Sequence, residues 1–128
     1  MGASSGSFHE STEVLKPETM DRHRAIVSLM EELEAVDWYD QRVDAATDDE
    51  LRAILAHNRD EEKEHAAMVL EWLRRHDAKL DEHLRNYLFT EQSVIEREHE
   101  LEDQGGGSPV ASADGSLGIG SLRVRSGR

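Results

Sequence analysis

The longest stretch without a helix breaker is the feature that most constrains the fold of this chain. From Glu18 to Gln104 the sequence contains neither glycine nor proline. Architectures built from β-strands place turn residues about every 8–12 positions, so a stretch of this length indicates an all-α body. Pro17 stands directly before it, where it suits the first turn of a helix because its missing N–H is not needed there.

Apolar residues recur at helical spacing in two long segments, which predicts an antiparallel helical hairpin. The first segment runs from about Pro17 to Ala46, and its apolar stripe consists of Ala25, Leu29, Leu33, Val36 and Val43. The second stripe consists of Leu51, Ile54, Leu55, Val69, Trp72 and Leu73. Between them, Thr47 and Glu50 have the spacing of a capping box, so we expect the second helix to start at Thr47.

A third helix is predicted to begin near Asp77–Asp81. Its apolar residues are Leu80, Leu84, Tyr87 and Leu88. We expect Thr90 to interrupt it before a charged stretch that ends near Asp103, either a solvated helix or a frayed end. The predicted helical domain therefore covers residues 17–103, after a disordered N-terminal segment over residues 1–16.

Charge and composition exclude several classes of protein. The chain has 15 basic and 28 acidic side chains and a net charge of −13, which argues against nucleic acid or anionic lipid as its main partner. It has no cysteine, which excludes disulfides, thiolate metal sites and cysteine nucleophiles. No apolar run is long enough for a membrane span, and Met1–Gly6 lack the parts of a secretory signal. We expect a soluble, cytoplasmic protein.

Three polar side chains interrupt the apolar stripes of the hairpin at one height. Glu32 lies fifteen positions before Thr47 and Glu62 fifteen positions after it, so the two are level across an antiparallel pair. His65 follows Glu62 by three positions and projects from the same face of its helix, one turn away. Burial of an unpaired carboxylate is costly, so something must compensate these charges.

Two glutamates and one histidine are half of a ferritin-type dinuclear site, which takes ligands from four helices. A two-fold homodimer of hairpins would complete a ferritin-like four-helix bundle, and it would also cover the apolar stripes of a chain with a thin core. The four carboxylates of the dimer balance two divalent cations. Carboxylate and imidazole ligands suit iron or manganese, and zinc is an alternative.

A structural interpretation of the same residues stays open. The Glu-x-x-His pattern is weak alone, because 28 acidic residues and seven histidines make chance matches common. On this interpretation His65 is an interface histidine, and Asp60–Glu64 is a solvated run of charges.

Glu31–Asp40 and His57–His65 closely resemble the encapsulated ferritins of bacteria, and the resemblance covers about residues 13–90 and 114–123. It implies that Glu32, Glu62 and His65 are ferroxidase ligands contributed by two subunits. It also implies a ring of five dimers, hence a decamer, with two iron ions at each dimer.

The resemblance gives four neighbouring residues a role. Trp38 and Tyr39 match residues that line the site, and the register allows a hydrogen bond from Tyr39 to it. Glu31 and Glu34 match a secondary metal site on the path of incoming iron. The simpler alternatives are that both aromatic residues only pack and that both glutamates are ordinary acidic side chains off the apolar stripe.

Residues 104–113 are predicted to be a flexible linker by their glycine and serine content. Asp114–Arg123 places three apolar anchors, Leu117, Ile119 and Leu122, among glycines and serines. The resemblance implies that this segment is the peptide that docks on an encapsulin shell, and the alternative is a disordered tail or a cloning remnant. Val124–Arg128 has no predicted role.

These observations favour a ferroxidase that oxidises Fe²⁺ to Fe³⁺ and feeds iron storage inside a cytoplasmic encapsulin nanocompartment. Two alternatives remain at this point. One is a non-catalytic acidic cargo or scaffold protein that binds metal loosely. The other is a di-manganese enzyme with catalase-like activity on the same ligands.

Overall fold

The computed structural model describes residues 7–106, and within this range the chain is helical and contains no strand. The helices are α2 (Pro17–Ala45), α3 (Asp49–Arg75), α4 (Ala78–Tyr87) and α5 (Val94–Gly106). The predicted all-α class is therefore confirmed. The predicted encapsulin-docking segment, Asp114–Arg123, the segment Val124–Arg128 and most of the predicted linker lie outside the described residues.

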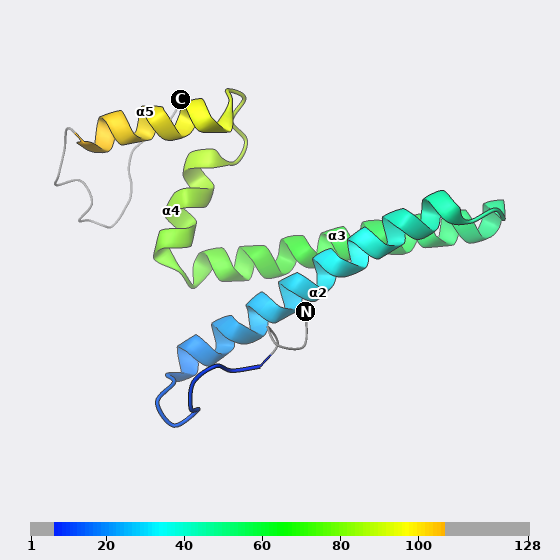
Figure 1. Ribbon diagram of the computed structural model, residues 1–128, viewed down its shortest axis with the longest axis horizontal. Helices are drawn as coiled ribbons and strands as arrows, with labels where there is room; N and C mark the ends of the chain where they lie inside the picture. The colour runs from blue at the N-terminus through cyan, green and yellow to red at the C-terminus, as the bar shows by residue number, and fades with distance from the viewer. Residues whose placement is uncertain (1–6, 107–128) are drawn as a thin grey trace. The chain divides into compact units, whose positions relative to one another are not determined.

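Helices α2 and α3 lie side by side and form the predicted antiparallel hairpin (Figure 1). Pro17 occupies the first turn of α2, as expected. The start of α3 differs from the prediction, because its N-cap is Asp48 and not Thr47. The Asp48 carboxylate accepts a hydrogen bond of 2.9 Å from the backbone N–H of Leu51. A carboxylate satisfies the free N–H groups of a helix start and also interacts favourably with the helix dipole, which a threonine hydroxyl does not.

The hairpin has a very small core of its own. Ala66 and Leu73 of α3 are the only buried apolar residues among those described. An ion pair between the two helices joins Arg59 on α3 to Asp40 on α2 at 3.2 Å. Large apolar side chains that remain about half exposed on the two helices are Ile26, Leu33, Trp38, Leu51, Ile54 and Met68. Three residues of the predicted apolar stripes, Leu33, Leu51 and Ile54, are therefore left largely uncovered by a single chain.

The chain divides into two compact units between His76 and Asp77, and α4 and α5 belong to the second unit. Asp77 caps α4 by accepting a hydrogen bond from Leu80 N–H at 3.0 Å. The charged stretch predicted as solvated or frayed forms a helix of its own, α5, because the Ser93 hydroxyl caps its first turn through Glu96 N–H at 3.0 Å. Helix α5 ends at Gly106, three residues beyond the predicted domain end.

Residues 7–16 have a defined course where the sequence suggested disorder. Phe8 packs against His23 of α2 with a ring-centroid distance of 4.4 Å. Val14 N–H donates to the Ser11 carbonyl at 3.1 Å, which closes a turn. One aromatic contact and a local turn thus hold this short segment against the hairpin. Within the described residues, no helix has the length and apolarity that a membrane span requires.

Candidate metal centre

Glu32 of α2 and Glu62 and His65 of α3 meet at the middle of the hairpin. Their potential ligand atoms, one from each side chain, all lie within 4.8 Å of one another. The His65 Nδ1 atom is 3.5 Å from Glu62 Oε1 and 3.7 Å from Glu32 Oε1. No second group of three such side chains comes this close in the part of the chain that the structure describes.

The hairpin geometry brings these residues together. The short connection Ala46–Asp48 places positions equally distant from it at the same height, which brings Glu32 level with Glu62. One helical turn separates Glu62 from His65, so both project from one face of α3. Glu32 and His65, which are far apart in the sequence, therefore lie close together on two facing helices.

The three side chains are open on one side. Glu32 and Glu62 are about a quarter exposed, at 26% and 25%, and His65 is 41% exposed. A site complete within one chain would bury its ligands more deeply. Three ligand side chains also fall short of what two metal ions need, because ferritin-type dinuclear sites use four carboxylates and two histidines.

The basic neighbours of Glu62 on α3 are engaged elsewhere. Arg59 pairs with Asp40 and Asp60, and Lys63 pairs with Asp60 at 3.7 Å. Among the described residues, Glu62 therefore has no lysine or arginine partner, and its ion-pair partner is His65.

The electrostatics at Glu32 show a deficit of positive charge. A hydrogen bond with Glu62, together with burial and the negative charge of Glu62, raises the pKa of Glu32 above its ordinary value of 4.5. The charge of Glu31 acts in the same direction, and His65 opposes it. A bound cation would favour the ionised form of both carboxylates and would therefore oppose this rise in the pKa of Glu32. The donor set is two carboxylates and an imidazole without thiolate, which fits iron or manganese and also accepts zinc.

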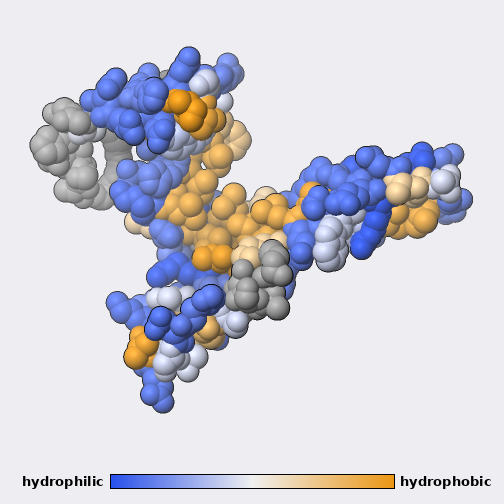
Figure 2. Space-filling model, in the orientation of Figure 1, coloured by the Kyte–Doolittle hydropathy of each residue, from blue (hydrophilic) through white to orange (hydrophobic). Residues whose placement is uncertain are grey.

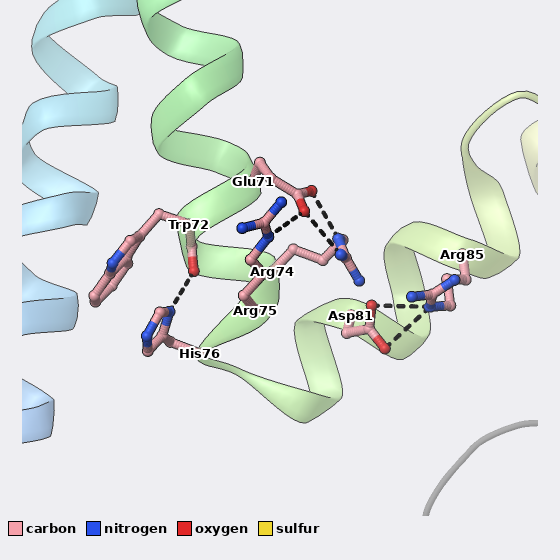
Figure 3. A network of polar contacts seen from close by, with 7 residues as sticks. All are labelled: Glu71, Trp72, Arg74, Arg75, His76, Asp81 and Arg85. Atoms are coloured by element: carbon pink, nitrogen blue, oxygen red, sulfur yellow. Dashed lines mark hydrogen bonds and ion pairs between the residues drawn. The ribbon is translucent and has the colours of Figure 1, made fainter.

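A second carboxylate on α3 has the opposite surroundings. Glu71 lies between the guanidinium groups of Arg74 and Arg75, with contacts of 2.8 Å and 2.6 Å (Figure 3). These hydrogen bonds lower the pKa of Glu71 from 4.5 to about 2. The chain therefore neutralises Glu71 with its own side chains and leaves the pair Glu32 and Glu62 without such a partner.

The aromatic residues of α2 are placed by an arginine that the sequence analysis missed. The Arg42 guanidinium lies 5.8 Å from the ring centre of Trp38 and 5.3 Å from that of Tyr39, within the range of cation–π contacts. Its positions three and four residues after the two rings are the signal that could have revealed this contact. Within residues 7–106, Tyr39 donates no hydrogen bond to Glu32, Glu62 or His65.

The remaining candidate residues lie outside the cluster. Glu31 and Glu34 are exposed on α2, and Trp38 is 49% exposed. Their expected roles as a secondary metal site and as a lining residue stay predictions. His57 is exposed on α3 and lies 3.8 Å from Glu61, away from the metal-ligand cluster.

Comparison with known proteins matches residues 7–91 to a family model described as EncFtn-like. The chain is 67% identical to an encapsulated ferritin-like protein of Rhodospirillum rubrum, over 96% of this chain and 92% of that protein. It is 50% identical to a ferritin-like protein of Thermotoga maritima, over 90% and 96% of the two chains. Among solved structures, a protein of Nitrosomonas europaea matches with a TM-score of 0.66 and 63% identity, over 68% of this chain and 96% of that one.

Proposed function

The chain belongs to the EncFtn-like family, and from that premise we propose that it is a ferroxidase whose di-iron centre is shared by two copies of the chain. The observation that carries the proposal is the half-site of Glu32, Glu62 and His65, with ligand atoms within 4.8 Å and one side open. The family name supports iron as the metal. The open side supports a second copy as the source of the missing ligands.

Charge supports a dimer with two ions. Two copies bring together four carboxylates, which repel one another unless cations neutralise them, and two divalent ions carry the matching charge. The uncovered apolar stripes on α2 and α3 provide the surface for this association. Helix pairs from two copies would form the four-helix bundle in which ferritin-type sites are built.

Each residue of the half-site has a distinct task. Fe²⁺ is the substrate, and two Fe²⁺ ions supply one electron each to dioxygen. Glu62 is our candidate for the bridging carboxylate, because its Oε1 atom lies 3.5 Å from His65 on its own helix and a ligand oxygen of Glu62 lies within 4.8 Å of one of Glu32 across the hairpin. Glu32 and His65 complete the ligand set of each copy. Fixed carboxylates favour the ferric product over the ferrous reactant because they interact more strongly with the higher charge.

The flanking residues extend this proposal along α2. Tyr39 and Trp38 would line the approach to the centre from the C-terminal side of Glu32. Arg42 contacts both rings through cation–π interactions. Glu31 and Glu34 would attract incoming Fe²⁺ as an exposed acidic pair.

We further propose that the chain works inside an encapsulin nanocompartment in the cytoplasm. The relative from Rhodospirillum rubrum is named as an encapsulated protein, which supports this assignment. Asp114–Arg123 would dock on the shell, residues 104–113 would provide reach, and dimers would assemble into a ring, a decamer by family resemblance. Storage capacity would then belong to the shell.

Iron oxidation by matched variants tests the enzymatic part. We expect Glu62→Gln and His65→Gln to lower the initial rate of Fe²⁺ oxidation in air by more than about 100-fold, because loss of a ligand should exceed the 10–100-fold cost of losing its supporting contacts. The controls are Glu61→Gln and His57→Gln, an exposed pair on the same helix, which should keep the rate of the unmodified protein. Ferric absorbance after anaerobic loading measures the rate.

Equal rates in all four variants would contradict the ferroxidase proposal and favour a non-catalytic metal-binding cargo protein. Release of oxygen from peroxide by the manganese-loaded protein, without iron oxidation, would favour the catalase-like alternative.

A further inference from the structure

Arg42 lies in the last turn of α2 and contacts two aromatic rings instead of a carboxylate. Its guanidinium carbon lies 5.8 Å from the ring centre of Trp38 and 5.3 Å from that of Tyr39. Figure 2 shows a largely hydrophilic surface at the end of the hairpin where α2 and α3 are joined. Among residues 7–106, Arg42 nevertheless forms no ion pair with a carboxylate. The charge of this arginine is therefore directed at the two rings.

Two aspartates that precede Arg42 on α2 have other partners. Asp37 Oδ1 accepts a hydrogen bond from Gln41 Nε2 at 3.2 Å, and Asp40 pairs with Arg59 of α3 at 3.2 Å. Residues three and four positions apart are neighbours on a helix surface, so the rings are the side chains that α2 itself places next to the guanidinium. A planar guanidinium stacks on aromatic faces, which a lysine ammonium does not. The contact therefore depends on arginine as a residue type and not only on its charge.

The two rings continue two different lines of side chains along α2. At about 100° per residue, Tyr39 projects roughly 20° from the direction of Glu32, the ligand candidate of this helix. Trp38 projects roughly 20° from Glu31 and roughly 40° from Glu34 by the same rule. The first ring is half-buried, and the second is 49% exposed. The guanidinium that contacts both rings therefore joins the line of the metal ligand to the line of the exposed acidic pair.

We propose that Arg42 is a positioning residue, which fixes the rings of Trp38 and Tyr39 and so keeps open the path by which Fe²⁺ reaches Glu32. This inference rests on the proposed function and deepens it, because it assigns control of substrate arrival to a residue outside the ligand set. Exposed side chains otherwise exchange between rotamers within nanoseconds. Within the described residues, Arg42 forms no hydrogen bond or ion pair with any of the three ligand candidates. It therefore acts on the arrival of Fe²⁺ and not on its oxidation.

A simple charge effect of Arg42 predicts the opposite kinetics. A cation beside an approach path repels Fe²⁺, so removal of its charge alone would speed the arrival of the metal. Loss of a positioning contact slows the arrival instead, because the freed rings enter the path for part of the time. A basic side chain in the last turn of a helix also interacts with the helix dipole, which changes stability and neither kinetic constant. The direction of the change in KM therefore distinguishes a positioning role from both of these effects.

The test measures the initial rate of iron oxidation by the full-length protein as a function of Fe²⁺ concentration. Arg42→Leu should raise KM by at least about threefold and change kcat by less than about twofold, because two cation–π contacts are lost and no ligand is. Arg42→Lys keeps the charge without the planar stacking group and should give an intermediate KM. The matched control is Arg24→Leu, which removes an exposed arginine eighteen positions earlier that projects in the same direction from α2. This control should leave KM unchanged or lower it.

The positions of the rings are measured separately in the metal-free protein. The chain has two tryptophans, Trp38 and Trp72, so fluorine NMR of protein labelled with fluorotryptophan gives two signals, which Trp38→Phe assigns. Arg42→Leu should shift or broaden the signal of Trp38, and Arg24→Leu should not. The signal of Trp72 should stay unchanged in both variants, which also verifies that each is folded.

The proposal is overturned if Arg42→Leu leaves KM unchanged or lowers it, or if it reduces kcat without raising KM. It is also overturned if the signal of Trp38 is the same with and without the guanidinium. An unmodified protein that does not oxidise Fe²⁺ would instead contradict the proposed function.

Discussion

Two carboxylate clusters on the same hairpin differ in whether the chain's own basic side chains neutralise them. Glu71 near the end of α3 is neutralised by Arg74 and Arg75, and its pKa falls to about 2. Glu32 and Glu62 at the middle share one half-exposed histidine, and the pKa of Glu32 rises. The first cluster is self-sufficient and has a structural role. The second is left short of positive charge, which is the property expected of a site that takes cations from outside.

The largest expected effect is the rise in thermal stability on metal binding, which should depend on one cluster and not on the other. Fe²⁺ added anaerobically at about 100 times its dissociation constant should stabilise the folded protein by about 2.7 kcal/mol. This corresponds to a rise in Tm on the order of 10 °C. Glu62→Gln should abolish the rise, and Glu71→Gln should keep it, as measured by thermal unfolding with and without the metal. A similar rise in both variants would show that the metal binds elsewhere.

A smaller effect should appear in the pH dependence of the metal-free protein. The pKa of Glu32 is raised on folding, so its carboxyl lowers stability at neutral pH, and this penalty disappears as the pH falls through the raised pKa toward 4.5. The pKa of Glu71 is lowered, so its contribution is present above pH 4.5 and is lost as the pH falls toward about 2. The two clusters therefore act in opposite directions and in different pH windows.

Urea unfolding of the metal-free protein, of its Glu32→Gln variant and of its Glu71→Gln variant measures the free energy of unfolding across both pH windows. At pH 7, Glu32→Gln should be more stable than the unmodified protein, and the difference should shrink toward pH 4.5. Glu71→Gln should be slightly less stable at pH 7, with a difference that vanishes only near pH 2. If the free energy of unfolding of both variants had the same dependence on pH, the two clusters would not differ in the way described.

Much of the fold could be predicted because it depends on local patterns. The long stretch without glycine or proline predicted helices, and the spacing of apolar residues predicted the hairpin. The register of Glu32 against Glu62 followed from counting, because an antiparallel pair with a short connection allows little choice. The cap of α3 was assigned one residue too early, since Thr47 and Asp48 are both good caps and the pattern alone does not choose between them.

Other features depend on contacts that sequence patterns do not specify. The placement of Arg42 over Trp38 and Tyr39 is a choice of side-chain rotamer, and helical spacing only permits it. The packing of Phe8 on His23 joins a segment without periodicity to a helix, so the segment could not be distinguished from a disordered one. Nothing in the sequence indicated the left-handed conformation of Phe89, because phenylalanine rarely adopts a positive φ.

The central claim is that one chain holds half of a dinuclear iron centre and a second copy supplies the other half. Anomalous X-ray diffraction from crystals of the iron-loaded protein tests it most directly. We expect two iron positions for each pair of chains, both held by Glu32, Glu62 and His65 from the two copies. Iron held by these three side chains of a single copy, with no ligand from a second chain, would contradict it.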